Sequence, residues 1–270
     1  MIRLADTETE EGLGRLLAGC GFDRALGSKI YTHALCYGNR YRFCDLWLVE
    51  ADGQVAGAAS QYNGTVTLTL SEAADPAEVG EFLQATVGAV FEMDAQTARR
   101  LGPHLPAHWG RATHPVLCWR GPAPVPTPLP PGRTLEETPP LGQVHQLLCQ
   151  ATPGFEGEAP FEAWYVDSSC RMRRGLCHAA LVKGEGQALA TAGVYHRMPG
   201  CGVIACVATH PRHRRQGYAA HLLHHLVGGL LEAGETPFLL AATPDLAPYY
   251  QGLGFSLWGE ATVLTRTAGE

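Results

Sequence analysis

The sequence predicts an α/β protein with a mixed sheet, arranged as two domains of similar fold in tandem. Three observations predict it: strand and helix patterns that alternate in the second half, the same order of patterns in the first half, and an internal repeat between the halves. The length of 270 residues suits two domains of ordinary size. We expect domains at residues 1–120 and 134–270, joined by a linker at 121–133.

The linker is the clearest boundary in the chain. Its sequence, GPAPVPTPLPPG at residues 121–132, alternates proline with other residues. Each proline fixes φ and removes an amide donor, so the segment should run as extended polyproline II. Ligands of SH3 domains look similar, but a stiff connector is the simpler interpretation.

The internal repeat spans this linker. Residues 44–62 align without a gap on residues 177–195, an offset of 133. Both copies show a β-forming run, a tight turn that contains glycine, and a second β-forming run, at turns 51–53 and 184–186. This pattern predicts one β-hairpin in each half, and the constant offset favours a duplicated domain.

Apolar spacing places the other elements. In the second half the predicted helices lie at 141–149, 161–173, 218–233 and 246–253, and the strands at 178–183, 187–195, 203–209, 237–241 and 255–264. In the first half we expect helices near 8–19, 25–37 and 75–87 and strands near 45–51, 54–61 and 65–70.

Composition excludes several classes of protein. The formal net charge of −6 argues against a nucleic-acid-binding protein, and no run of about 18 apolar residues could span a membrane. The start, MIRLADTETEE, carries acid where a signal peptide is apolar. Nine cysteines without a C-x-x-C pair suit reduced thiols. We therefore expect a cytoplasmic protein with no nucleic-acid or membrane partner.

A basic run, HPRHRRQGYAA at residues 210–220, stands out in this acidic chain. An apolar strand precedes it and the predicted helix at 218–233 follows it. The first amides of a helix lack intrahelical partners, so this turn can bind an anion. The predicted contacts are Arg214 and Arg215, Gln216, Gly217, Tyr218 and Ala219. A pyrophosphate fits such a turn better than a nucleic-acid duplex does.

The helix that follows separates its faces. Leucines occupy one side, whereas His221, His224 and His225 occupy the other. Histidines one turn apart suggest a metal, but no cysteine or carboxylate ligand stands beside them in the sequence. We expect a solvated polar face and no metal cofactor.

The second half resembles the GNAT superfamily of acyl-CoA-dependent N-acyltransferases over about residues 134–266. The segment VATHPRHRRQGYA is similar to its V-x-P-x-x-R-x-x-G-x-G/A pyrophosphate motif, and YYQGLGF to its F-Y-x-x-L-G-F segment. The resemblance implies the acyl-CoA N-acyltransferase fold, with acetyl-CoA as co-substrate. It also implies that backbone groups of Val207, Ala208 and Thr209 pair with pantetheine and that the amides of 214–219 hold the pyrophosphate. Ala219 stands where many members carry glycine.

The same resemblance implies that Tyr250 is the general acid that protonates the departing thiolate; otherwise Tyr249 or Tyr250 packs under the cofactor. The base stays open among His196, Glu162 and a water path. Cys206 suggests a covalent acyl-enzyme, but a buried structural thiol is the stronger interpretation because no histidine stands beside it in the sequence.

The first half resembles the same fold without the binding motif. SEAADP at residues 71–76 stands where the turn would be, with two acids and no glycine or arginine. A phosphate would be repelled there. We expect this half to pack against its partner or to shape the acceptor pocket.

The function predicted from the sequence is transfer of an acetyl group from acetyl-CoA to a primary amine of a small molecule or peptide, by direct attack in a ternary complex. The chain lacks the G-x-S-x-G, H-E-x-x-H and P-loop motifs of hydrolases, zinc proteases and nucleotide triphosphatases. Two alternatives stay open: a non-catalytic acyl-CoA-binding or regulatory module, and a nucleic-acid-binding domain led by the basic run. The acceptor and the oligomeric state also stay open, with a homodimer as one option.

Overall fold

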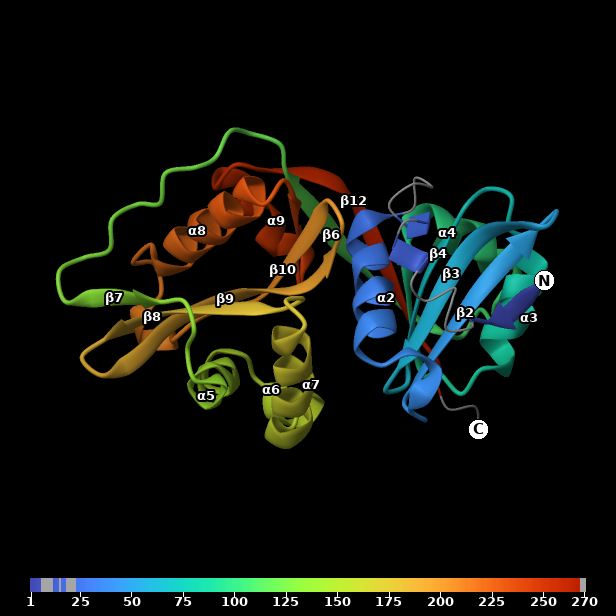
Figure 1. Cartoon of the computed structure of the whole chain (residues 1–270), viewed down its shortest axis with the longest axis horizontal. Coiled ribbons are helices and arrows are strands. Elements are labelled where there is room, and N and C mark those ends of the chain that lie inside the picture. The colour runs from blue at the N-terminus through green and yellow to red at the C-terminus, as the bar shows by residue number, and fades with distance from the viewer. Residues whose placement is uncertain (6–11, 15, 18–22, 268–270) are drawn as a thin grey trace. The chain divides into compact units, whose positions relative to one another are not determined.

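The computed structural model describes residues 1–5, 12–14, 16–17 and 23–267 (Figure 1). The helix expected near 8–19 falls largely outside these residues. No helix in the described part of the chain combines the length and the apolar character needed to cross a bilayer.

The chain divides into two compact units. The first holds the chain up to Leu117, together with Leu240–Gln251 and the residues from Ser256 onward, and the second holds Cys118–Leu239 and Gly252–Phe255. The break after Leu117 lies close to the expected linker. Most of the C-terminal segment, however, groups with the first unit, and the reason is a strand pairing described next.

The first unit is a mixed sheet in the order β1-β2-β3-β4-β5-β12-β6. The strands are β1 (Ile2–Leu4), β2 (Cys44–Ala51), β3 (Gln54–Tyr62), β4 (Thr65–Leu70), β5 (Val90–Asp94), β6 (Gly110–Trp119) and β12 (Phe255–Thr265). β4 and β5 run parallel, and β12 pairs antiparallel with β5 from Ala261 to Thr265. This pairing draws the end of the chain into the first unit.

Helices cover this sheet. α2 (Arg24–Cys36) contacts β2 to β5, and α3 (Pro76–Ala85) packs with α4 (Ala95–Leu101). Each of the three begins after an aspartate whose carboxylate accepts main-chain amides: Asp23, Asp75 and Asp94. The unit also contains a 3₁₀ turn (Pro244–Leu246) and most of α9 (Ala247–Gly252).

The second unit is a mixed sheet in the order β11-β10-β9-β8-β7. Its strands are β7 (Arg133–Glu136), β8 (His178–Gly184), β9 (Gln187–Met198), β10 (Cys201–Thr209) and β11 (Thr236–Leu240). Figure 1 shows α8 (Tyr218–Glu232) on one side of these strands, and α5 (Leu141–Ala151), α6 (Phe155–Glu158) and α7 (Phe161–Arg173) on the other. α8 buries its leucine face, as its apolar spacing predicts.

The internal repeat is confirmed residue for residue. β2 and β3 form one hairpin and β8 and β9 the other, closed by residues 52–53 and 185–186, all four with positive φ. Each hairpin also carries a register shift at the same place, after Val49 and after Val182. A shared turn and a shared irregularity at the same offset are typical of duplicated domains.

The elements of the second half were predicted more completely than those of the first. α7 matches its predicted bounds, and the other second-half elements that were predicted differ by at most three residues at either end. β7 and α6 had no predicted counterpart. In the first half, β1, β5, α4 and β6 had no predicted counterpart. β1, β5 and α4 are short, with three, five and seven residues. The longer β6 begins with the mostly polar run Gly110–His114, which carries no strand signal.

Gly254, in the YYQGLGF segment, is required by close packing. Its φ is +110°, and a Cβ there would lie 2.5 Å from Cη2 of Trp119. The indole in turn donates from Nε1 to the carbonyls of Gly121 and Pro122 at 3.1 and 3.0 Å. This glycine therefore lets the turn pass over a tryptophan that anchors the start of the linker.

We expect Gly254→Ala to lower the free energy of unfolding by about 2 kcal/mol or more, because it combines backbone strain with a steric clash. Urea denaturation of the full chain measures the change. Gly252→Ala is the matched control, since a Cβ there meets nothing within 4 Å and should change stability by about 0.5 kcal/mol at most. Equal stability of the two variants would contradict this packing.

Candidate functional site

The basic run forms a turn that leads directly into α8. After the 3₁₀ turn Pro211–His213, Arg215 has φ +62°, and Gly217 has φ +80° as the N-cap of α8. No side chain among the described residues caps this helix. The first amides of α8 are therefore open toward the turn, and the positive end of the helix dipole favours an anion there.

Side chains around the turn fix its shape. Arg214 donates from Nη2 to the carbonyl of Ala151 at 3.0 Å, which ties the turn to the end of α5. The buried Tyr218 donates its hydroxyl to Oε1 of Gln216 at 3.0 Å and accepts from Nε of Arg133 at 3.2 Å. Arg215 is exposed. The side chain of Tyr218 is thus structural, and only its amide can serve a ligand.

The strand before the turn opens on one side. β10 pairs in parallel with β11 only from Cys201 to Ile204, whereas its antiparallel pairing with β9 continues to Thr209. Between Ala205 and Ala208 the register with β9 shifts, and Cys206 takes φ +53° there. The last residues of β10 therefore extend beyond its described ladder with β11, which leaves that strand edge for another extended chain.

The opened stretch of β10 includes Val207, Ala208 and Thr209, and it continues directly into the turn. Ala208 is buried and its two neighbours are half-buried. A strand edge followed by an uncapped helix start suits a ligand that has an extended amide chain and a phosphate group. The structure thus brings the predicted residues 207–209 and 214–219 together along one path.

Comparison with protein families bears on the same stretch. Residues 141–255 match the model of the acetyltransferase (GNAT) family. This segment is a GNAT domain. The match includes the opened strand β10, the turn and the start of α8. No curated protein matches the chain.

Solved structures extend the likeness to the first half. A tandem GNAT protein from the clavulanic acid biosynthesis pathway has a TM-score of 0.65 at 14% identity, with 100% of this chain and 99% of that chain covered. A GCN5-related N-acetyltransferase from Sphaerobacter thermophilus has a TM-score of 0.65 at 16% identity, covering 98% and 95%. One from Kribbella flavida, with 19% identity, has a TM-score of 0.58 and covers 80% and 89%. The predicted tandem GNAT-like fold is confirmed.

Tyr250 lies on α9 and belongs to the first unit. Its side chain is buried, and its ring stands edge-on to Tyr249 with centroids 5.3 Å apart. Burial, with a smaller effect of Tyr249, raises the pKa of Tyr250 to about 12. At neutral pH this phenol is therefore a hydrogen-bond donor. Tyr249 is 43% exposed.

The two side chains considered as bases differ in their surroundings. His196 is half-buried, and Nη1 of Arg171 lies 3.3 Å from its Nε2. Because a guanidinium only donates, the imidazole nitrogen that meets it must accept. Arg171 is itself held by Asp167 at 2.7 Å. Glu162 is exposed in the first turn of α7.

Cys206 has the properties of a structural thiol. Burial raises its pKa to about 11, so the thiolate form is scarce at neutral pH. Burial and the neighbouring Cys206 likewise raise the pKa of Tyr195 well above its ordinary value. A neutral thiol beside a neutral phenol is a poor nucleophile, which disfavours an acyl-enzyme at this position.

The histidines of α8 correct one expectation, because they do not form a solvated face. All three are half-buried. Nδ1 of His221 lies 2.6 Å from the carbonyl of Thr127 in the linker, and Nε2 of His224 lies 3.0 Å from that of Leu253. Nε2 of His225 lies 3.1 Å from Glu137. The sequence could not show this, because the linker is distant from α8 along the chain.

The loop at residues 71–76 has the opposite polarity to the turn before α8. Arg100 donates to three of its carbonyls: Ser71 at 2.7 Å, Glu72 at 3.1 Å and Ala74 at 2.6 Å. The following helix α3 is capped by the Asp75 carboxylate, and Pro76 supplies no amide. The carbonyl groups of this loop therefore surround the Arg100 guanidinium.

Arg100→Ala should lower the free energy of unfolding by about 2 kcal/mol, because three carbonyls lose a charged donor. Arg99→Ala, an exposed neighbour on the same helix, should change it by about 0.5 kcal/mol at most. Thermal and urea unfolding of both variants measure this. Identical stabilities would show that Arg100 does not hold the loop.

Proposed function

We propose that residues 141–255 transfer an acetyl group from acetyl-CoA to a primary amine of a small molecule or peptide. The observation that carries the proposal is the continuity of an opened strand edge on β10 with the uncapped start of α8. The GNAT family model covers both features. We place the reaction in the cytoplasm, which suits a sequence whose nine cysteines include no C-x-x-C pair.

Two parts of acetyl-CoA, pantetheine and the pyrophosphate, have proposed partners in the second unit. Backbone groups of Val207, Ala208 and Thr209 pair with the amides of pantetheine, as an added strand would. The pyrophosphate lies against the amides of residues 214–219. Arg215, exposed beside this turn, adds a positive charge suited to phosphate oxygens.

In the proposed reaction the neutral amine attacks the thioester carbonyl within the ternary complex. Its nitrogen forms the new amide bond and loses a proton to a base or a water path, while the carbon–sulfur bond breaks. Tyr250 serves as the acid for the departing thiolate. Its pKa of about 12 keeps it protonated throughout the neutral range.

Replacing Arg214 and Arg215 together with glutamine should weaken acetyl-CoA binding about ten- to a hundredfold, because charge-assisted contacts to phosphate are lost. Calorimetry with acetyl-CoA measures the change. Arg212→Gln removes an exposed charge from the same run and should leave the dissociation constant nearly unchanged. Unaltered acetyl-CoA affinity in the double variant, or tight DNA binding that only the double variant loses, would overturn the assignment.

Tyr250→Phe should lower kcat about a hundredfold, the usual contribution of an acid catalyst, and should leave acetyl-CoA affinity unchanged. Steady-state rates with a panel of primary amines measure this. The activity of the unaltered protein should not fall through deprotonation of Tyr250 below about pH 11, since the pKa is about 12. Full activity in Tyr250→Phe would remove the tyrosine from the mechanism.

A second function is favoured by the surroundings of His196, because the imidazole nitrogen that faces Nη1 of Arg171 at 3.3 Å already acts as an acceptor, which makes this side chain a poor base. This second function is that of a non-catalytic module that binds acyl-CoA. Tight acetyl-CoA binding without acetylation of any amine in the panel would establish it.

A further inference from the structure

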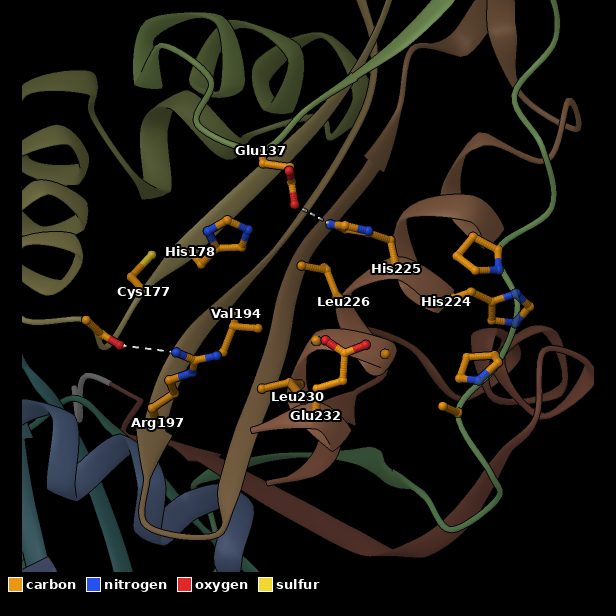
Figure 2. A pocket seen from close by; sticks show the side chains of 16 residues that line it. Glu137, Cys177, His178, Val194, Arg197, His224, His225, Leu226, Leu230 and Glu232 are labelled. Carbon is orange, nitrogen blue, oxygen red and sulfur yellow. Dashed lines mark hydrogen bonds and ion pairs between the residues drawn. The ribbon is translucent and has the colours of Figure 1, made fainter. Parts of the chain in front are cut away.

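A cavity lies beside the C-terminal half of α8, and we call it the α8 cavity (Figure 2). Its volume is about 560 Å³, which is within the range of small-molecule sites. Residues 224–232 of α8 form one wall, the first residues of β8 and parts of β9 another, and Pro124 and Pro126 of the linker a third. Gly228 follows Gly217 by 11 residues, so the cavity lies about 16 Å along the helix from the proposed pyrophosphate site.

The end of α8 gives this cavity a negative character. The last turn of the helix contains no basic residue and ends on Glu232. The helix dipole is negative at this end and favours cations over carboxylates. Because Glu232 lines the cavity, its charge adds to that of the dipole, and the cavity suits a positively charged group.

The other charged groups around the cavity do not reverse this sign. Glu137 adds a second carboxylate, 62% exposed and 3.1 Å from Nε2 of His225. Arg197 is neutralised by Glu235 at 3.2 Å. Burial and the nearby Arg197 lower the pKa of His178, so this imidazole is neutral at pH 7. Figure 2 shows Glu137 and Glu232 from different walls of the cavity.

Two adjacent glycines keep the cavity wide. Gly228 and Gly229 lie in the interior of α8, where each glycine costs about 1 kcal/mol relative to alanine. A Cβ at either position would meet nothing within 4 Å. Packing within the chain therefore does not require them, and both line the cavity together with Glu232.

We propose that the α8 cavity binds a small aliphatic diamine, with one ammonium group at Glu232 and the end of α8 and the other toward Glu137. A metal ion is the weaker candidate, because the described residues contain no group of three or more histidine, cysteine or carboxylate side chains placed to hold one. This site is separate from the proposed acetyl-CoA path and does not depend on acetyl transfer.

Calorimetry of the full chain with 1,4-diaminobutane tests the proposal, with 1,4-butanediol as the uncharged analogue and succinate as the anionic one. Only the diamine should bind. Glu232→Gln should weaken its binding at least tenfold, whereas Glu158→Gln, an exposed carboxylate on α6, should leave it unchanged. The double variant Gly228→Ala, Gly229→Ala should unfold at a higher temperature and yet bind the diamine more weakly, because the methyl groups favour the helix and occupy part of the cavity wall near Glu232.

The outcomes separate this site from the acetyl-CoA site. Diamine binding of unchanged strength in both Glu232→Gln and the double alanine variant would place the amine elsewhere and overturn the proposal, as would the absence of any binding. Diamine binding should persist when Arg214 and Arg215 are replaced with glutamine. A protein that binds the diamine in the α8 cavity but not acetyl-CoA would refute the proposed acetyl transfer and leave this inference intact.

Discussion

The start of α8 is the constraint on which the rest of the site depends. A helix that begins at a glycine, with no side chain to accept its first amides, presents several donors and a positive dipole to whatever lies in front of it. The path of β10 matters because this strand leads directly into the turn before α8. Its ladder with β11 ends at Ile204, so the strand edge beyond that residue can pair with a ligand. The contacts of Arg214 and Tyr218 then hold the turn in place.

The first half has the same scaffold as the second but lacks the uncapped helix start, and only a few residues account for the difference. The repeated hairpins share their turn and their register shift, so the two halves use the same scaffold. In the first half, the Asp75 carboxylate caps the first turn of α3, and Pro76 has no amide to donate. The loop before this helix binds the Arg100 guanidinium through its carbonyl groups. The turn before α8 therefore suits an anion, whereas the loop at residues 71–76 has a capped helix start and carbonyls that surround a cation.

Much of the fold and part of the site could be predicted from the sequence. The hairpins, α7 and the turn at 214–219 follow from local rules, because periodicity, turn residues and helix starts are set by residues close together in the chain. The covering of His221 and His225 by Thr127 and Glu137 could not be predicted, since it depends on where a proline-rich segment crosses the helix. The α8 cavity was missed for the same reason.

The pairing of β12 with β5 has a consequence for how this protein can be divided. The strand that follows the GNAT segment completes a sheet whose other strands come from the first 120 residues. A cut within the linker would therefore separate β5 from its neighbour and leave a bare strand edge, a surface prone to aggregation. Although the two halves share a fold, the first half does not contain all the strands of its own sheet.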